Sequence, residues 1–479
     1  MKKYFKTKLF LLALISITIS CSKSEDIPQD IEINDFVWGG MNAYYKWQGE
    51  VPDLADNKFS TREQLNSYLS GFSSPDQLFN SLIYRPGDVD RFSWIVDDYI
   101  ALENSFQGIR LTSGMKLIGV EYGDGSGNVF VVVRDVVAGS DADTKGITRG
   151  MIISEVNGTQ LTTSNVNSLF APDTFTISLA DYNGGNPVAN GTTIDIVKTQ
   201  IQENAVKIAT VINQGANRIG YLMYNQFSAS HDADLNNAFA TFRNAGITDL
   251  VVDLRYNGGG SVRTATYLAS MISGQPTTNL FSQQIWNDKV MSALDNSLFL
   301  NNFRDRITNT DSNGQVILDE PINTVNLSSV YFIVTGRTAS ASELVINGLL
   351  PYMDVNLVGT QTVGKQVGSI TLYDSDDYTR TGPNFNNNHT WAMQPIVLEI
   401  QNSNGENEPN GYIPEVILEE DVANLGVLGD PTEPLLARTI QYITTGARGP
   451  VLSRNNVKKP IWNSEMRNLD YNNMYVDLK

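Results

Sequence analysis

Cysteine and histidine are almost absent from this sequence. Its 479 residues include one cysteine, Cys21, and two histidines, His231 and His389. A single cysteine excludes an intrachain disulfide, and these residues are too few for a zinc site of the usual Cys/His kind. A calcium site built only from carboxylates stays open, although no run resembles the usual calcium-binding loop. We therefore expect no metal and no other cofactor.

Basic side chains are also scarce. Lys and Arg together number 34 against 52 Asp and Glu, which gives a formal net charge of −18. Proteins that bind nucleic acids draw most of their affinity from Lys and Arg that neutralise phosphates, so this balance argues against a nucleic-acid partner. The hydrophobic fraction of 41% is ample for folded cores. At roughly 100–200 residues per domain, the length predicts about two to four domains.

Long apolar runs are confined to the N-terminus, where Leu9 to Ile19 follows a lysine-rich start. This pattern predicts a secretory signal peptide over residues 1–20. Cys21 comes directly after it, where bacterial lipoprotein signals are cleaved and lipidated, although Thr18 replaces the common leucine; an ordinary signal peptide with an incidental cysteine is the alternative. We expect a polar tether over residues 21–34 and a lipid anchor in the outer membrane of the cell envelope, on its periplasmic or its exterior face.

The rest of the chain changes character three times. Residues 35–107 are rich in aromatics and compatible with helices, and they predict a small helical N-terminal domain. Residues 108–200 contain short β-branched runs separated by Gly, Asn and Asp turns, which predicts a small β-rich module. Residues 201–449 alternate apolar strands with amphipathic helices, the pattern of a layered α/β fold with parallel strands. A polar, Asn-rich tail over residues 450–479 is expected to be loosely held.

A short turn of small residues joins an expected strand, Val330 to Val334, to an expected helix near Glu343. Ser340 lies in this turn, where free backbone N–H groups and the positive end of the helix dipole would surround its hydroxyl. Such a turn can hold a nucleophile next to an oxyanion hole. The alternative is structural, because Ser340 and Glu343 have the spacing of a capping box, in which the serine only caps the helix.

Lys365 lies one helix and one strand after Ser340 in the expected order of elements, so the chain can return to the same end of the sheet. A serine nucleophile needs a base, and a lysine can serve if burial lowers its pKa from about 10.4 towards 7–8. Taken alone, a Gly-Lys pair is most often a solvated turn. His231 and His389 are expected in capping, surface or loop positions rather than in catalysis.

These motifs occur in an order that resembles the C-terminal processing (tail-specific) serine peptidases, a Ser/Lys family that includes lipoproteins of the Bacteroidetes group. The resemblance implies a multidomain α/β fold with a ClpP/crotonase-like peptidase core, a β-rich PDZ module and a small helical N-terminal domain. In the core the matching stretches are Asp253–Gly260, Thr338–Glu343, Gly364–Lys365 and Gly411–Glu415. In the β-rich module Gly139–Asp143 and Gly146–Gly158 are similar to the PDZ domain that these enzymes carry.

The resemblance also implies the roles of the site residues. Ser340 would be the nucleophile and Lys365 its general base. Backbone N–H groups would form the oxyanion hole, and they would belong to Ala341, Gly259 and Gly260. Glycines suit that loop because the backbone must approach the substrate closely, although a plain turn between strand and helix is the competing interpretation.

One position departs from the family pattern. Many relatives place a glutamine four residues after the lysine, and here that residue is Ser369. Gln366, adjacent to the lysine, is the candidate to take its place, so Gln366 and Ser369 are both candidates for orienting the base. Asp253 and Arg255 are expected to anchor the end of a strand rather than to touch substrate.

The function that follows is a serine endopeptidase of the C-terminal processing type. A PDZ module captures a C-terminal carboxylate and pairs the peptide as an added strand, so the expected partner is a protein or peptide held by its C-terminus. Two alternatives remain open at this point. One is a catalytically inactive peptide-binding scaffold on the same fold, and the other is a Ser/Lys hydrolase of non-peptide esters or amides.

Overall fold

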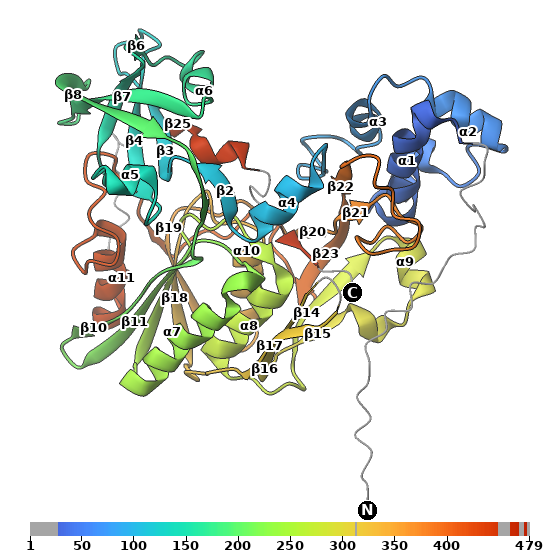
Figure 1. The fold of residues 1–479 in the computed structure, drawn as a ribbon. Coiled ribbons are helices and arrows are strands. Elements are labelled where there is room, and N and C mark those ends of the chain that lie inside the picture. Colours follow the sequence, from blue (N-terminus) through green and yellow to red (C-terminus); the bar gives the residue numbers. More distant parts are fainter. Residues whose placement is uncertain (1–26, 312–313, 449–459, 469–473, 477–479) are drawn as a thin grey trace, which may run out of the picture.

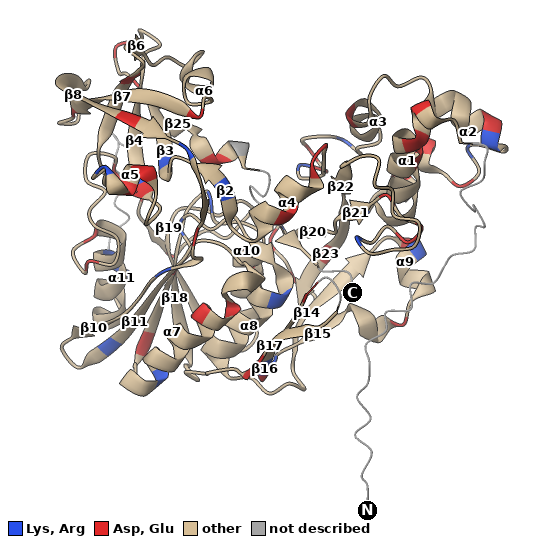
Figure 2. Cartoon of the chain, in the orientation of Figure 1, with Lys and Arg blue, Asp and Glu red and all other residues tan. Residues whose placement is uncertain are grey.

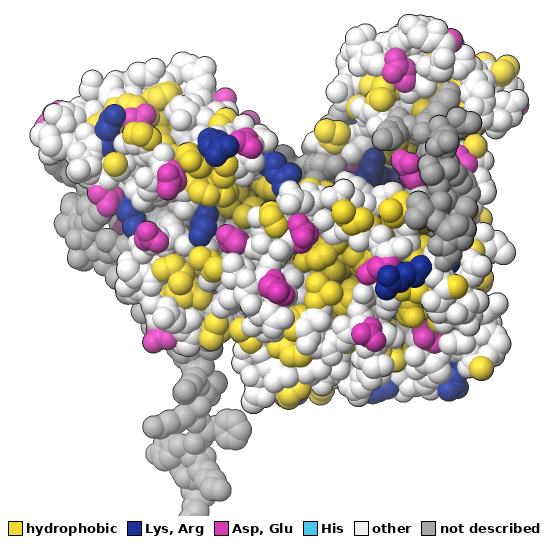
Figure 3. Space-filling view, turned by 180° about the vertical axis from the view of Figure 1, so that it is seen from behind, with side chains coloured by type: hydrophobic (Ala, Val, Ile, Leu, Met, Phe, Trp, Pro, Cys, Tyr) yellow, Lys and Arg dark blue, Asp and Glu magenta, His cyan; other side chains and the backbone are white. Residues whose placement is uncertain are grey.

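The computed structural model describes residues 27–311, 314–448, 460–468 and 474–476, and three regions can be followed along it in Figure 1. The N-terminal helices (blue) and the β-rich region (teal to green) form two upper lobes, and an α/β body (green to orange) lies below them. Acidic and basic residues are interspersed in all three regions (Figure 2). Seen from behind (Figure 3), a notch separates the two upper lobes. No helix among the described residues combines the length and the apolar character needed to span a bilayer.

The N-terminal region is built from short helices. Its main helix, α1 (Glu32–Tyr44), begins inside the stretch expected to be a tether, residues 21–34. That boundary is wrong at its C-terminal end, because Ile31 is buried in the hydrophobic core and Asn34 is buried beside it in α1. The other elements are η1 (Gln29–Ile31), η2 (Gln48–Glu50), η3 (Pro52–Leu54), α2 (Arg62–Leu69), α3 (Pro75–Ser81), β1 (Trp94–Val96) and α4 (Tyr99–Phe106). Cys21, the expected lipidation site, and the signal peptide lie outside the described residues.

The β-rich region is a single antiparallel sheet with its own core, formed by side chains such as Val131, Ile153 and Ile177. A two-stranded ribbon of β2 (Ile109–Thr112) and β9 (Thr199–Gln202) carries the chain into and out of it. Its strands are β3 (Met115–Glu121), β4 (Val129–Val136), β5 (Ile152–Val156), β6 (Thr159–Gln160), β7 (Thr174–Asp181) and β8 (Val188–Val197), flanked by α5 (Asp141–Thr144) and α6 (Val166–Leu169).

The α/β body contains a six-stranded sheet in the order β10-β11-β12-β18-β19-β24, parallel except for β10. Successive residues point to opposite faces: Phe332 packs on the side of α7, α8 and α10, and Ile333 on the side of α11. Both faces are thus buried, as parallel sheets require. The elements are β10 (Val206–Gln214), β11 (Asn217–Tyr224), η4 (Ala229–His231), α7 (Asp232–Ala245), β12 (Asp249–Asp253), α8 (Val262–Ser273), β18 (Ser329–Val334), α10 (Ala341–Leu349), β19 (Asp354–Gly359), β24 (Val416–Ile417) and α11 (Pro434–Thr445).

A second six-stranded sheet connects the body to the N-terminal helices, in the order β13-β26-β20-β23-β14-β15. The Lys46 N–H donates to the Ile396 carbonyl at 2.8 Å, which fastens the end of α1 to this sheet. The strands are β13 (Gly260–Ser261), β14 (Leu280–Trp286), β15 (Leu300–Asn302), β20 (Val367–Ser369), β23 (Ile396–Asn402) and β26 (Met474–Tyr475). Smaller elements complete the region: α9 (Asp288–Ala293), η5 (Asn296–Phe299), the hairpin β16 (Arg306–Thr310) and β17 (Val316–Pro321), β21 (Leu372–Tyr373) and β22 (Ala392–Gln394).

The tail over residues 450–479 differs from the expectation of a loosely held segment wherever the structure describes it. Strand β25 (Pro460–Asn463) pairs with β3 at the edge of the β-rich sheet, and η6 (Ser464–Arg467) follows it. Trp462 is buried and stacks on Phe170, with ring centres 5.7 Å apart. The polar composition concealed these contacts, because a few buried residues are enough to hold the described parts of the tail.

Candidate active site

Ser340 occupies a strained turn between β18 and α10. Its backbone has φ +67° and ψ −119°, and a positive φ is unusual for a residue other than glycine. The side chain is fully buried, and its Oγ forms no hydrogen bond within the described residues. The Ser340 N–H donates to Oε2 of Glu343 at 2.8 Å. The turn therefore has the backbone half of a capping box, but the serine hydroxyl is not used as a cap.

The Glu343 carboxylate joins the serine turn to the lysine turn. It is almost completely buried. Oε2 accepts the N–H groups of both Ser340 and Lys365, each at 2.8 Å. Oε1 accepts the Gly364 N–H at 2.7 Å and the Thr362 hydroxyl at 2.5 Å. Four donors thus satisfy one carboxylate, and the backbones of the two candidate catalytic residues are held at a shared atom.

Lys365 is buried, with a side chain that belongs to the same cleft as Ser340. Burial lowers the pKa of its ammonium group from 10.5 to about 7, against the opposing charges of Asp90 and Glu343, which raise it. The preceding Gly364 has φ +79°, and a Cβ at that position would lie 2.3 Å from the Pro409 carbonyl oxygen. Only glycine fits there, so the approach of the chain to Lys365 depends on it.

Part of the wall around Lys365 comes from the N-terminal region, which sequence reasoning missed. The lysine Nζ lies 4.9 Å from the centre of the Phe92 ring. Arg91 donates to the Gly364 carbonyl at 2.8 Å, and Asp90 is the nearby acid that raises the lysine pKa. These residues lie far from Lys365 along the chain, and no local pattern marks them.

The expected oxyanion donors fall into two groups. Ala341 is the first residue of α10, so its N–H has no acceptor within the helix. The Gly259 N–H donates to Oδ1 of Asn257 at 2.9 Å, which corrects the expectation for that residue: its single donor is already engaged. Gly260 lies in β13 with φ +132°, and a Cβ there would lie 2.2 Å from the Phe227 carbonyl oxygen. Ala341 and Gly260 remain the candidate donors of the oxyanion hole.

The two residues expected to orient the base lie differently. Gln366 lines the cleft, whereas Ser369 is buried in β20 beside it. The Ser369 Oγ lies 2.5 Å from Oε1 of Gln394 and 3.1 Å from the Met474 carbonyl oxygen. Gln394 therefore supplies an amide next to the position where relatives have glutamine. The full lining of the cleft is Ser340, Glu343, Leu344, Asn347, Lys365, Gln366, Ile400, Asn407, Glu408, Tyr412 and Met474.

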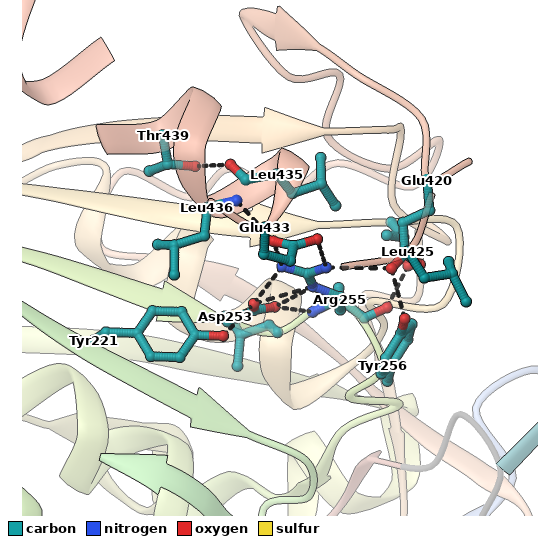
Figure 4. Close-up of polar contacts among 12 residues, drawn as sticks. Tyr221, Asp253, Arg255, Tyr256, Glu420, Leu425, Glu433, Leu435, Leu436 and Thr439 are labelled. Atoms are coloured by element: carbon teal, nitrogen blue, oxygen red, sulfur yellow. Dashed lines mark hydrogen bonds and ion pairs between the residues drawn. The ribbon is translucent and has the colours of Figure 1, made fainter. Parts of the chain in front are cut away.

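Asp253 is the last residue of β12, and it pairs with Arg255 at this strand end, where the sequence predicts an anchor (Figure 4). Arg255 is fully buried, and its guanidinium donates to both oxygens of Asp253 and, at 2.7 and 2.9 Å, to both oxygens of Glu433. A third acid, Glu420, lies 3.2 Å away. All these contacts are internal, so the cluster fixes the loop rather than binding substrate.

Neither histidine is among the described residues that line the cleft. His231 pairs with Asp234 and His389 with Asp374, each at 3.0 Å. Across the part of the chain that the structure describes, no group of three or more His, Cys, Asp and Glu is arranged to hold a metal ion. The chemistry available in this cleft is that of a hydroxyl beside a buried amine.

Comparison with known families gives two matches along the chain. Residues 218–381 match the model of peptidase family S41, and residues 32–94 match that of the peptidase S41 N-terminal domain. The first covers Ser340 and Lys365, and the second covers the residues that wall in the lysine.

Two curated proteins of Arabidopsis thaliana are similar to about half of the chain. Carboxyl-terminal-processing peptidase 3, chloroplastic, is 27% identical over 256 residues, which are 50% of this chain and 44% of that protein. Carboxyl-terminal-processing peptidase 1, chloroplastic, is 28% identical over 255 residues, which are 51% of this chain and 46% of that protein. The chain therefore spans less than half the length of these relatives.

A solved structure covers much more of the chain. It is that of a Bacteroides fragilis protein assigned to the S41 proteases, which is 22% identical and superposes with a TM-score of 0.65 over 86% of this chain and 97% of its own. At this identity the likeness concerns the fold, which is a multidomain α/β arrangement with an N-terminal domain.

Proposed function

We propose that the chain is a serine endopeptidase of the C-terminal processing type, with Ser340 as nucleophile and Lys365 as general base. The matches of residues 32–94 and 218–381 to the N-terminal and peptidase models of family S41 support this proposal. One observation carries this proposal. The buried Ser340 hydroxyl, which has no hydrogen-bond partner among the described residues, shares a cleft with a buried lysine whose pKa is lowered to about 7. Glu343 accepts hydrogen bonds from the backbones of both residues. Near neutral pH such a lysine is neutral often enough to accept a proton.

The proposed reaction uses each group in turn. Neutral Lys365 Nζ takes the proton of Ser340 Oγ as that oxygen bonds to the substrate carbonyl carbon. The carbonyl oxygen becomes negative and receives hydrogen bonds from the N–H groups of Ala341 and Gly260. The lysine ammonium then gives its proton to the leaving amine as the peptide bond breaks. A water molecule, deprotonated by the lysine, releases the acyl group and restores the serine hydroxyl.

The proposal also assigns a role to each of the remaining regions. The body, with its parallel sheet buried between helices, serves as the ClpP/crotonase-like core. The β-rich region serves as a PDZ module that captures a protein or peptide by its C-terminus and pairs it as an added strand. We further propose that Cys21 carries the lipid that attaches the protein to the cell envelope.

Cleavage of an unstructured protein with an apolar C-terminus tests the proposal. The chain lacking residues 1–21 is incubated with this substrate beside Ser340→Ala and Lys365→Ala, and products are read by intact mass. Ser292→Ala and Lys58→Ala, both at exposed positions, are matched controls. We expect cleavage by the unchanged chain and both controls, and none by the two site variants in their folded state.

Two outcomes would contradict the proposal, and they differ. A folded chain that binds the substrate but never cleaves it, with or without Ser340, is a peptide-binding scaffold. Hydrolysis of small acyl esters or amides that depends on Ser340, without cleavage of any protein or peptide, indicates a non-peptide hydrolase.

A further inference from the structure

Strand β26 runs through the centre of the site, although it lies more than a hundred residues beyond Lys365 in the sequence. It is the short red arrow beside the β20 label in Figure 1. Met474 pairs with Gly260 of β13, and Tyr475 pairs with Ser261 of β13 and with Ser369 of β20; every pairing is parallel. The strand thus fills a gap between the glycine loop on one side and the strand that follows the lysine on the other.

The backbone contacts of this segment are those of a peptide added to a sheet. The Val476 N–H donates to the Ser369 carbonyl at 3.0 Å. The Met474 carbonyl oxygen lies 3.1 Å from the Ser369 hydroxyl. Without β26, strands β13 and β20 would face each other across the width of one strand with unpaired backbone groups, which is the arrangement that accepts an extended peptide.

The two side chains of β26 reach two different cavities. Met474, 1% exposed, lines the cleft that contains Ser340 and Lys365. Tyr475 lines a second, solvent-open cavity and stacks on Phe106 with ring centres 4.3 Å apart. Because neighbouring residues of one strand line the two spaces, β26 forms part of the wall that separates them.

The second cavity extends from the glycine loop to the β-rich region. Its lining includes Gly259 and Gly260 from the loop, and Arg110 and Lys116 from β2 and β3 at the edge of the β-rich region. A peptide captured by that region would therefore approach the nucleophile from this cavity. In the structure, β26 lies across that approach.

We propose that residues Met474 to Val476 occupy the place of a substrate strand, so that the chain closes its own active-site groove. An extended peptide substrate binds between β13 and β20, parallel to both, with an apolar side chain in the position of Met474. The identification of this groove as a substrate site rests on the proposed peptidase function, whereas its occupation by β26 does not. Opening requires that this short strand leave both β13 and β20.

A binding experiment without catalysis tests the proposal. In the full chain with Ser340→Ala, the second substitution Val476→Pro removes the N–H that donates to the Ser369 carbonyl. The probe is a fluorescein-labelled synthetic peptide of residues 470–479, and its binding is followed by anisotropy. The probe binds only chains in which β26 has left the groove, so the apparent affinity is the intrinsic affinity multiplied by the fraction of open chains. We therefore expect the probe to bind at least about threefold more tightly once the strand is weakened.

Controls separate this effect from a change in folding. Met474→Glu, which places a further carboxylate in the cleft that already holds the buried Glu343, should act in the same direction as Val476→Pro, whereas Met466→Glu, at an exposed position of the same tail, should leave binding unchanged. A probe peptide carrying proline at the position of Val476 should bind none of the variants. Thermal unfolding is measured for each variant. If Val476→Pro or Met474→Glu no longer unfolds cooperatively, the conclusion is drawn from whichever of the two still does.

The outcomes are distinct. Equal probe affinity in the folded variants and the unchanged chain overturns the proposal and makes β26 a permanent strand of the sheet. With Ser340 present, Val476→Pro should also raise kcat/KM for a peptide substrate at least about threefold, chiefly through KM. If binding tightens but no variant cleaves, the peptidase function fails while the occupation of the groove stands.

Discussion

The backbone N–H groups of Ser340 and Lys365 donate to the same oxygen atom, Oε2 of Glu343, each over 2.8 Å. These two residues are far enough apart in sequence to adopt many relative positions. The shared carboxylate restricts them to one, because a buried carboxylate in four hydrogen bonds has little freedom to move. The relative position of the hydroxyl and the amine thus depends on a third side chain that takes no part in the proposed proton transfers.

Replacing Glu343 with glutamine tests this dependence. The glutamine side chain has an NH2 group in place of one of the two carboxylate oxygens, which together accept four hydrogen bonds. At least one backbone N–H therefore loses its acceptor. We expect kcat to fall by about 10- to 100-fold and the free energy of unfolding to fall by about 1–3 kcal/mol. Loss of the charge that raises the Lys365 pKa should also shift the rise of the pH–rate profile to lower pH. Glu121→Gln, at an exposed position, is the control; an unshifted profile would refute the electrostatic part.

The activity should depend on pH through Lys365. Only the neutral amine accepts a proton, and its pKa is lowered to about 7 by burial. We therefore expect kcat/KM to rise with pH, about tenfold per pH unit below the pKa, and to level off above about pH 7. The profile is measured with a peptide substrate between pH 5 and 10. A rise centred near the pKa of free lysine would contradict the role of burial.

Stability should depend on pH through the same group. The pKa of Lys365 is about 7 in the folded protein and about 10.5 in an unfolded chain, so the unfolded state binds more protons between these values. Stability therefore rises with pH across this window, by up to about 1.4 kcal/mol per pH unit. Lys365→Met lacks this pH-dependent contribution. The free energy of unfolding of this variant should therefore exceed that of the unchanged chain most below pH 7, and the difference should shrink towards pH 10. Denaturant unfolding at several pH values measures it, with Lys58→Met as the exposed control.

Removing the Phe92 ring should weaken the base. The ring covers Lys365 Nζ at 4.9 Å, and burial is the largest cause of the lowered lysine pKa. In Phe92→Ala, water reaches the amine, the pKa rises towards its ordinary value, and the rise of the pH–rate profile moves to higher pH. Activity at pH 7 falls, whereas activity at pH 9 is largely retained. Phe59→Ala, in the same region but outside the cleft lining, should leave the profile in place; a shift in both variants would point to a general loosening.

Arg255 should matter for stability more than any surface arginine. Arg255→Met leaves the buried carboxylates of Asp253 and Glu433 without their shared cation, which costs about 3–5 kcal/mol. Arg306→Met, which breaks an exposed pair with Asp319, should cost less than about 1 kcal/mol. Denaturant midpoints measure both. Equal losses would show that the Arg255 cluster is not the anchor of the glycine loop.

Several features of the site could be predicted because they are local. The small-residue turn between a strand and a helix placed Ser340 at the start of α10, where the structure has it. The spacing of Ser340 and Glu343 predicted a capping box, and its backbone half is present. The expectation that burial would lower the lysine pKa agrees with a value of about 7.

Other features depend on segments that meet only in the folded chain. Asp90 and Phe92 reach Lys365 from the N-terminal region, and Met474 enters the cleft from the tail. None of these residues carries a local signal, because their neighbours in sequence are ordinary loop or tail residues.

The amino-acid sequence by itself determined the order of strands and helices, the turn that presents Ser340 and the glycine that precedes Lys365, because periodicity and backbone freedom act over a few residues. Only the tertiary structure decided which carboxylate joins the two turns, which ring buries the amine and which strand fills the groove. Those choices depend on packing between distant segments, where burial and hydrogen-bond satisfaction are decided jointly by all the residues that meet.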